Sequence, residues 1–332
     1  MSRRRWLSLL AGVVGVVVVV AVVAIVRLQN VHHYAKHVRH QGWGSGVYAG
    51  HKPADDEAFA KWRGSEIQVA TDFMGPGSWL QFKHPLVVLL AWRYDKPLRL
   101  VLSVPMWPSS GGSLSAAAAG DYNGYYQRLA ASLGHDGRGD TIVRLGWEFN
   151  TPYFRWQAAD RKQAQRYAEA WRQAVGAMRS VAGQHFQFVW NPNLADDGVD
   201  PALGYPGDSY VDDIGLDVYD RSLHATESPR QRWDGLVHQR YGLAWQAQFA
   251  GAHHKPLAFP EWGVVHDPDI DTAGEDDPFF VRQMHDWFAS HDTAFECYFD
   301  DSSAHGAEFD LEGDAFPKAA AVYRQLFGTD GS

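Results

Sequence analysis

The sequence predicts an α/β fold, a (β/α)8 TIM barrel preceded by one N-terminal transmembrane helix. Short apolar runs alternate with helical segments along the chain, a pattern typical of a mostly parallel sheet. Eight such runs are present, the number that the barrel requires, and 332 residues is an ordinary length for it. The runs are residues 46–50, 66–71, 98–104, 141–146, 186–190, 213–217, 256–260 and 294–298.

The segments between these runs have the composition of helices. Residues 158–181 are rich in Ala, Gln and Arg, which are good helix formers. After a Gly/Ser loop, a helix of about fifteen residues is predicted from Asp121, because its aromatic and Leu side chains recur on one face. A helix is also predicted over residues 79–92, interrupted by Pro85. The other predicted helices are residues 55–63, 228–251, 279–290 and 316–327.

The N-terminus has the pattern of a membrane anchor. Residues 6–26 are apolar and uncharged, long enough to cross a bilayer, and the Arg residues 3–5 before them are expected to be cytoplasmic. We therefore expect a basic stub at residues 1–5, a single-pass span of the inner membrane, a linker at 27–42, and one folded domain at 43–332 outside the cytoplasm. The alternative is a cleaved signal peptide, which would make the protein secreted.

Composition argues against several classes of function. A net charge of −9 disfavours a nucleic-acid partner, since phosphate binding needs a basic surface. The single cysteine, Cys297, excludes an internal disulfide. No metal or other cofactor is expected, because the linker histidines lack carboxylate or thiol partners and the acidic stretch 267–277 lacks the spacing of a calcium loop. The 14 Trp favour a carbohydrate site, where aromatic faces stack on sugars.

Two of the apolar runs lead into a carboxylate. Glu148 follows the fourth run, and Glu261 follows the seventh. In a parallel barrel the chemistry lies at the carboxyl ends of the strands, so both side chains are predicted at the barrel mouth. Two carboxyl groups are the minimum equipment for glycoside hydrolysis. The sequence therefore predicts Glu148 and Glu261 as a catalytic pair.

Polar and aromatic residues near the predicted strand ends are candidates for substrate contacts. Arg144 shares a strand face with Glu148, where it supplies charge to the site or forms an ion pair in a core layer. Each Trp is either a sugar platform or a core residue, and the Asn side chains either bind hydroxyls or cap a loop. The predicted substrate-binding residues are Asp72, Trp107, Trp147, Asn150, Trp156, Trp190, Asn191, Tyr219, Trp262 and Tyr298.

Four segments carry a resemblance to a known family. They are residues 46–50 (GVYAG), 59–64 (FAKWRG), 189–193 (VWNPN) and, most specifically, 205–219 (YPGDSYVDDIGLDVY). The chain resembles glycoside hydrolase family 26, the β-mannanase family of the retaining clan of (β/α)8 barrels. The resemblance implies a barrel with an acid/base Glu at the end of its fourth strand and a nucleophilic Glu at the end of its seventh.

The resemblance also assigns roles. Glu148 and Asn150 fit the family's His-Glu-x-Asn acid/base motif, but Trp147 stands where the family has His. Glu261 fits the nucleophile, with Trp262 before the following glycine. Tyr219 is implied to donate its hydroxyl to the nucleophile.

The expected function is a retaining endo-glycosidase acting on a β-linked polysaccharide outside the membrane, such as a mannan, a mixed glucan or an exopolysaccharide. Its partners would be that polymer, the inner membrane through residues 6–26, and machinery for exopolysaccharide synthesis or export. Trp147 leaves the sugar open, since this position touches the sugar beside the cleaved bond. The alternatives are a non-catalytic polysaccharide-binding or export-accessory protein and a transglycosylase on the same fold.

Overall fold

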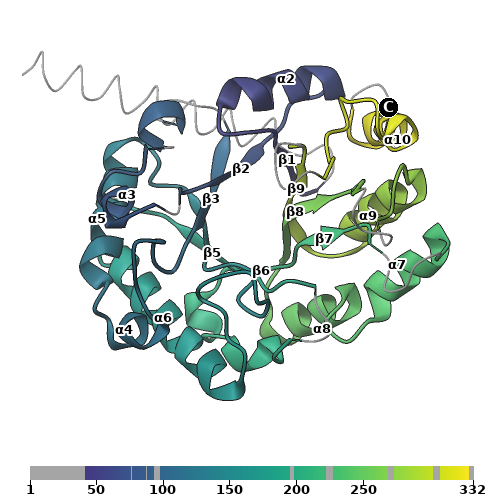
Figure 1. Cartoon of the computed structure of the whole chain (residues 1–332). Helices are drawn as coiled ribbons and strands as arrows, with labels where there is room; N and C mark the ends of the chain where they lie inside the picture. Colours follow the sequence, from purple (N-terminus) through teal and green to yellow (C-terminus); the bar gives the residue numbers. More distant parts are fainter. Residues whose placement is uncertain are drawn as a thin grey trace, which may run out of the picture. The chain divides into compact units, whose positions relative to one another are not determined.

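A closed ring of parallel strands surrounds the centre of the domain, with helices around its outside (Figure 1). The computed structural model describes residues 42–75, 77–86, 88–92, 98–194, 198–221, 227–267, 273–301 and 307–328. The strands are β1 (Gly44–Tyr48), β2 (Val69–Phe73), β3 (Arg99–Val104), β4 (Ile142–Leu145), β5 (Gln187–Trp190), β6 (Asp213–Gly215), β7 (Val218–Tyr219), β8 (Leu257–Gly263) and β9 (Thr293–Phe299).

The ring has eight positions. The strands pair in the order β6-β5-β4-β3-β2-β1-β9-β8-β7, and an additional pairing of β6 with β8 closes the ring. Both β6 and β7 pair in parallel with β8, at Ile214–Leu257 and at Val218–Trp262. They are therefore two pieces of one barrel strand, and the predicted eight-stranded parallel barrel is confirmed.

Helices cover the outside of the ring. They are α2 (Pro53–Arg63), α3 (Trp79–Lys83), α4 (Leu114–Ala119), α5 (Asn123–His135), α6 (Arg161–Arg179), α7 (Pro229–His238), α8 (Leu243–His253), α9 (Pro278–Ser290) and α10 (Pro317–Phe327). A π-helical turn (Val88–Trp92) and two 3₁₀ turns, η2 (Pro201–Gly204) and η3 (Asp208–Tyr210), complete the elements. Helix α6 begins where the Asp160 side chain accepts a hydrogen bond from the Gln163 N–H at 2.8 Å, which satisfies a free donor of its first turn.

Two predicted helices and one predicted loop differ from the structure. The helix expected over residues 79–92 ends at Lys83, shortly before Pro85, and a π-helical turn follows. The helix expected over residues 228–251 is divided into α7 and α8, because the chain turns so tightly at Gly242 that any side chain there would overlap the Leu236 carbonyl. The predicted Gly/Ser loop before Asp121 contains α4, which the Ser113 side chain caps.

Apolar side chains fill the barrel. A cluster separate from the main core draws its members from β2, β3, β4, β5, β8 and β9, namely Val69, Val101, Ile142, Val189, Ala258, Phe295 and Cys297. Ile142 and Arg144 are two residues apart on β4 and so share its inward face. The larger cluster lies between the strands and the surrounding helices, and it holds the outward residues of β4, Val143 and Leu145.

The expected stub, membrane segment and linker lie outside the described residues. Among the helices that are described, none is both long and apolar enough to cross a membrane. The anchor at residues 6–26 stays a prediction from the sequence.

Candidate active site

Arg144 is the centre of a buried polar cluster inside the barrel. Its side chain is 0% exposed. Its Nη1 donates hydrogen bonds to Glu261 Oε1 and, at 3.1 Å, to Ser103 Oγ. Its Nη2 donates to Asp217 Oδ2, and its Nε donates to Asn191 Oδ1 at 3.0 Å. Burial alone lowers the pKa of Arg144, but Asp217 and Glu261 outweigh it and raise that pKa, so the guanidinium stays charged.

A β-bulge turns Glu261 into this cluster. Along β8, Phe259 pairs with Glu296 and Trp262 pairs with Tyr298, so β8 uses three steps where β9 uses two. The extra residue breaks the alternation of faces and leaves Phe259 and Trp262 on the same outward side, where both contact Phe288 of α9. Glu261 between them faces the barrel interior. The strand also extends beyond its predicted end at residue 260, so Glu261 lies within β8.

Both oxygens of Glu261 accept hydrogen bonds. Oε1 accepts from Arg144, and Oε2 accepts from the Tyr219 hydroxyl at 2.9 Å. Burial, and after it the charge of Glu261, raises the pKa of Tyr219 well above its usual value, so the hydroxyl keeps its proton. The predicted contact between these two side chains is present. Together the two donors stabilise Glu261 as a carboxylate.

The turn after β4 holds Glu148 in an unusual backbone conformation. Its φ is 52°, in the left-handed region, and Gly146 just before it has a φ of 49°. The Glu148 N–H donates to the Asn191 carbonyl at 2.7 Å, which holds the turn against β5. Its Oε1 accepts a hydrogen bond from Asn193 Nδ2. A left-handed Glu costs free energy, and such residues cluster at functional sites.

The surroundings of Glu148 favour its protonated form. Burial raises its pKa to about 7, and the negative charge of Glu261 acts in the same direction. Arg144, Asn193 and Asp217 oppose these effects in part. Glu148 can therefore carry a proton near neutral pH, while Glu261 is held by two donors. The two carboxyl groups have different environments and so different chemical roles.

Asp217 is a member of the cluster that the sequence reading did not select. Its Oδ2 accepts from Arg144 and, at 3.1 Å, from Asn191 Nδ2. Burial, only partly opposed by Arg144, raises its pKa well above the usual value. The signal was present in the sequence: Asp217 stands two residues before Tyr219, the spacing that puts both on one strand face.

The predicted Asn residues position the site. Asn150 Nδ2 donates to the Asn193 carbonyl at 2.9 Å, and Asn150 Oδ1 accepts from the Asn193 N–H at 2.8 Å. This pair fixes the residue whose side chain contacts Glu148. Asn191 is occupied by Arg144 and Asp217, as described above. Both side chains are engaged with protein groups, so they orient the cluster around Arg144.

Trp147 begins an aromatic wall beside the cluster. Its ring centroid lies 5.7 Å from that of Phe73, 5.1 Å from Phe154 and 5.0 Å from Trp156. The Arg144 guanidinium lies 5.3 Å from the Trp147 ring, a cation–π contact. Trp156 Nε1 donates to the Trp147 carbonyl at 2.7 Å, which ties the following loop to the turn.

Four predicted sugar-contacting residues lie in the packed interior instead. Trp107 is 4% exposed, and Trp190, Trp262 and Tyr298 are 0% exposed. Trp262 faces α9 because of the bulge in β8, and the Tyr298 hydroxyl donates to the Phe309 carbonyl at 3.0 Å. The reading of these residues as substrate contacts is corrected: strand alternation or packing turns each of them into the protein, where bulky aromatic surface is most stable.

Asp72 is also buried, and its carboxylate is paired with other side chains of the protein. It is 0% exposed on β2, and its two oxygens contact His51 Nδ1 and Trp92 Nε1, each at 2.7 Å. The hydrogen bond to Asp72, against an opposing effect of burial, raises the pKa of His51. His51, whose side chain is 62% exposed, was not selected from the sequence. Asp72 therefore holds a histidine rather than a substrate.

Within the described residues, no group of three or more His, Cys, Asp or Glu side chains is arranged to hold a metal ion. Part of the acidic stretch 267–277, residues 268–272, lies outside the described residues.

Comparison with known families bears directly on this cluster. A family model described as glycosyl hydrolase family 26 matches residues 123–243, the span that carries Arg144, Glu148, Asp217 and Tyr219. The match covers about a third of the chain, and over this span the chain is similar to glycoside hydrolase family 26. The match confirms the resemblance read from the sequence. The matched span ends before Glu261, which the structure places against Arg144.

Individual relatives agree with the family assignment. The mannan endo-1,4-beta-mannosidase of Bifidobacterium adolescentis is 28% identical over 167 residues, which are 48% of this chain but only 16% of that protein. The catalytic domain of the Bacillus sp. JAMB-750 GH26 endo-beta-1,4-mannanase has 18% identity and a TM-score of 0.60, covering 90% of this chain and 88% of that one. A GH26 beta-mannanase from Bacteroides ovatus has 15% identity and a TM-score of 0.55, covering 90% of both chains. At these identities the two structures show only that the fold is shared.

Proposed function

We propose that this chain is a retaining, endo-acting glycoside hydrolase of family 26 that cuts a β-linked polysaccharide, with β-1,4-mannan as the first candidate. The observation that carries the proposal is the contrast between two carboxyl groups around Arg144. Arg144 and Tyr219 hold Glu261 as a carboxylate, whereas burial raises the pKa of Glu148 to about 7. A retaining glycosidase needs one ionised nucleophile and one protonated acid.

The reaction then has two steps. An oxygen of Glu261 attacks the anomeric carbon, the glycosidic C–O bond breaks, and Glu148 gives its proton to the departing oxygen. Glu148, now ionised, takes a proton from water, whose oxygen attacks the same carbon and releases Glu261. Each step inverts the anomeric centre, so the product keeps the configuration of the substrate.

The substrate proposal takes its lead from the relatives, three of which are named as mannanases. The electrostatics also favour an uncharged polymer. Three carboxyl groups, Glu148, Asp217 and Glu261, surround the single buried Arg144, so an acidic sugar would meet like charge. Trp147 packs its ring against Arg144 where the family has His, and it would influence how the sugar ring sits beside Arg144.

The proposed place of action is outside the cytoplasmic membrane. The basis is the uncharged apolar segment 6–26 behind three Arg residues. An anchored depolymerase would trim a polymer as it is exported, in company with the synthesis or export machinery. Fractionation of cells, with protease added to intact spheroplasts, tests this: digestion of the domain supports the location, and protection contradicts it.

The experiment for the activity uses the full-length chain. Wild type, Glu148→Gln and Glu261→Gln are incubated with galactomannan, mixed-linkage β-glucan and a bacterial exopolysaccharide, and products are read by mass spectrometry. Glu66→Gln is the matched control, since Glu66 is exposed and lies before β2, away from the cluster. Proton NMR of the first product formed from mannopentaose reports whether its new reducing end is β, as retention requires.

Cleavage of one polymer into mid-length fragments by wild type and the control, but by neither active-site variant, is the expected result. An α product would contradict the retaining mechanism. Products longer than the substrate would instead indicate transglycosylation. If wild type bound a polymer without cutting any, the accessory-protein alternative would replace the proposal.

A further inference from the structure

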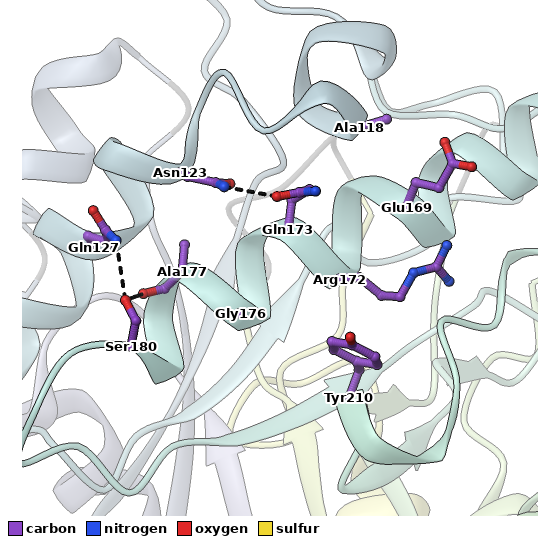
Figure 2. A pocket seen from close by; sticks show the side chains of 10 residues that line it. All are labelled: Ala118, Asn123, Gln127, Glu169, Arg172, Gln173, Gly176, Ala177, Ser180 and Tyr210. Carbon is purple, nitrogen blue, oxygen red and sulfur yellow. Dashed lines mark hydrogen bonds between the residues drawn. The ribbon is translucent and has the colours of Figure 1, made fainter.

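A groove of about 690 Å³ lies on the outer wall of the barrel, between α4, α5, α6 and η3 (Figure 2). Its volume is within the range of about 300–1,000 Å³ that is typical of small-molecule sites. None of its lining residues belongs to a strand or to the Arg144 cluster. The groove is therefore a feature of the helical layer, separate from the catalytic cluster inside the barrel.

Small residues on α6 make the floor of the groove. Gly176 is exposed, and a Cβ added to it would meet no atom within 4 Å. Ala177 lies beside it, and Figure 2 shows Asn123 and Gln127 of α5 on one side of this stretch. The open space thus exists because α6 carries no bulk at Gly176, although Gly is a poor residue for the middle of a helix.

Carboxamide side chains on both walls have unused hydrogen-bonding atoms. Asn123 Nδ2 donates to Gln173 Oε1 at 2.9 Å, and Gln127 Nε2 donates to Ser180 Oγ at 3.2 Å (Figure 2). The other polar atom of each amide has no hydrogen bond within the described part of the chain, and Asn123 Oδ1 is buried as well as unpartnered. Donors and acceptors are therefore both left over, in fixed orientations.

A tyrosine ring and one charge of each sign complete the lining. Tyr210 of η3 is half-buried and stands at one end of the groove (Figure 2). Glu169 and Arg172 lie along the same edge of α6, and the Arg172 guanidinium is held by a hydrogen bond to the Pro206 carbonyl at 3.3 Å. The charges balance, so the groove favours neither an anion nor a cation.

We propose that this groove is a second carbohydrate-binding site, which holds a stretch of the neutral polysaccharide chain while the catalytic cluster cuts another. A sugar ring is apolar on its faces and carries hydroxyl groups at its edges. The aromatic ring of the groove can pack against such a face, and its amide side chains can bond the hydroxyl groups. A protein partner would be expected to meet a more apolar surface at the centre of its interface. The proposal rests on the proposed function for the identity of the polymer.

A second site of this kind would raise the effective concentration of the polymer at the catalytic cluster. A polymer held at the groove stays attached to the enzyme, so its other segments meet the catalytic cluster at a higher effective concentration, and a weak second contact lowers KM for long chains without altering the chemical step. An oligosaccharide too short to reach both sites gains nothing. Polymer and oligosaccharide should therefore respond differently when the groove is blocked.

Gly176→Gln is the test variant, because Gly176 lines the groove, a Cβ added there meets no atom within 4 Å, and Gln has a higher helix propensity than Gly. Gly134→Gln is the matched control: Gly134 is an exposed helical glycine of α5, a Cβ added there would meet nothing within 4 Å, and it does not line the groove. Tyr210→Ala removes the ring as a second, independent disruption. All three are made in the full-length chain.

The expected result is a rise in KM for galactomannan of about three- to tenfold in Gly176→Gln and Tyr210→Ala, with kcat unchanged and turnover of mannopentaose unchanged. Gly134→Gln should match wild type on both substrates. In the Glu261→Gln background, affinity electrophoresis in galactomannan gels should show the same loss of binding for the two groove variants.

The failures are distinguishable. If wild type cuts mannopentaose but the groove variants keep the wild-type KM for galactomannan, the second site is refuted and the proposed function stands. Equal losses on polymer and oligosaccharide would show a structural effect and also refute it. If wild type cuts neither substrate and Glu261→Gln binds no galactomannan, mannan is the wrong polymer for both proposals.

Discussion

Glu261 and Glu148 are both glutamates of one buried cluster, but different backbone features turn their side chains into it. An extra residue in β8 reverses the alternation of side-chain faces along the strand and turns Glu261 inward. The turn after β4 delivers Glu148 through a left-handed backbone. The hydrogen-bond partners differ accordingly: an Arg and a Tyr on Glu261, and an Asn amide on Glu148. The comparison teaches that placement and partners, rather than residue type, separate the proposed nucleophile from the proposed acid.

Removing the nucleophile should have the largest effect. Glu261→Gln is expected to lower kcat by on the order of 10⁴-fold or more, because no covalent intermediate can form. The measurement is steady-state hydrolysis of the polymer found in the substrate panel, beside the exposed-site control Glu66→Gln. A loss of less than tenfold in kcat would contradict the assignment of Glu261 as the nucleophile.

The acid should show its role through pH. A carboxyl with a pKa of about 7 must ionise as pH rises through that value, so kcat/KM is expected to fall above pH 7. Glu148→Gln should lose about 10²–10⁴-fold in kcat, and less on an aryl glycoside whose leaving group needs no proton. An alkaline limb that persists unchanged in the residual activity of Glu148→Gln would assign the titration to another group.

The same pKa makes a prediction for stability. Because the pKa of Glu148 in the folded protein lies above its ordinary value of 4.5, its contribution is fully present below pH 4.5 and is lost as pH rises through about 7. Urea unfolding across this window should show a smaller decline for Glu148→Gln than for wild type. Equal slopes would mean that Glu148 is ionised in the folded protein at all these pH values.

A smaller effect is expected from the second donor to Glu261. Tyr219→Phe removes one hydrogen bond to a charged group and should lower kcat by about 10–100-fold. Its fold should be retained, as circular dichroism and urea unfolding can verify. If kcat stayed at the wild-type level, Arg144 alone would be sufficient to hold the nucleophile.

The smallest effect on activity should come from the residue just after the nucleophile. Trp262→Phe changes packing against α9 and leaves Glu296 without the indole donor at 2.6 Å, so it should cost about 1–3 kcal/mol of unfolding free energy. KM and kcat should stay near wild type. A large rise in KM with unchanged stability would restore Trp262 as a sugar platform.

The sequence anticipated more of the catalytic pair than of its surroundings. Glu148 and Glu261 could be selected because each follows an apolar run, and Arg144 because two-residue periodicity puts it on the face of Glu148. Asp217 was overlooked, although its position two residues before Tyr219 places both side chains on one strand face. The aromatic residues were the weakest predictions, because Trp and Tyr serve equally well in a core and in a sugar site.

By itself the sequence predicted the eight-stranded barrel, most of its helices and the resemblance to glycoside hydrolase family 26, because periodicity and turn residues act locally. Only the tertiary structure decided which way side chains point near the strand ends. A single extra residue in β8 reverses the faces that alternation assigns, turning Glu261 inward and Trp262 outward. The raised pKa of Glu148 likewise depends on burial, on the charges of Glu261 and Arg144 and on hydrogen bonds with Asn193 and Asp217, groups from different strands and loops that meet only in the closed barrel.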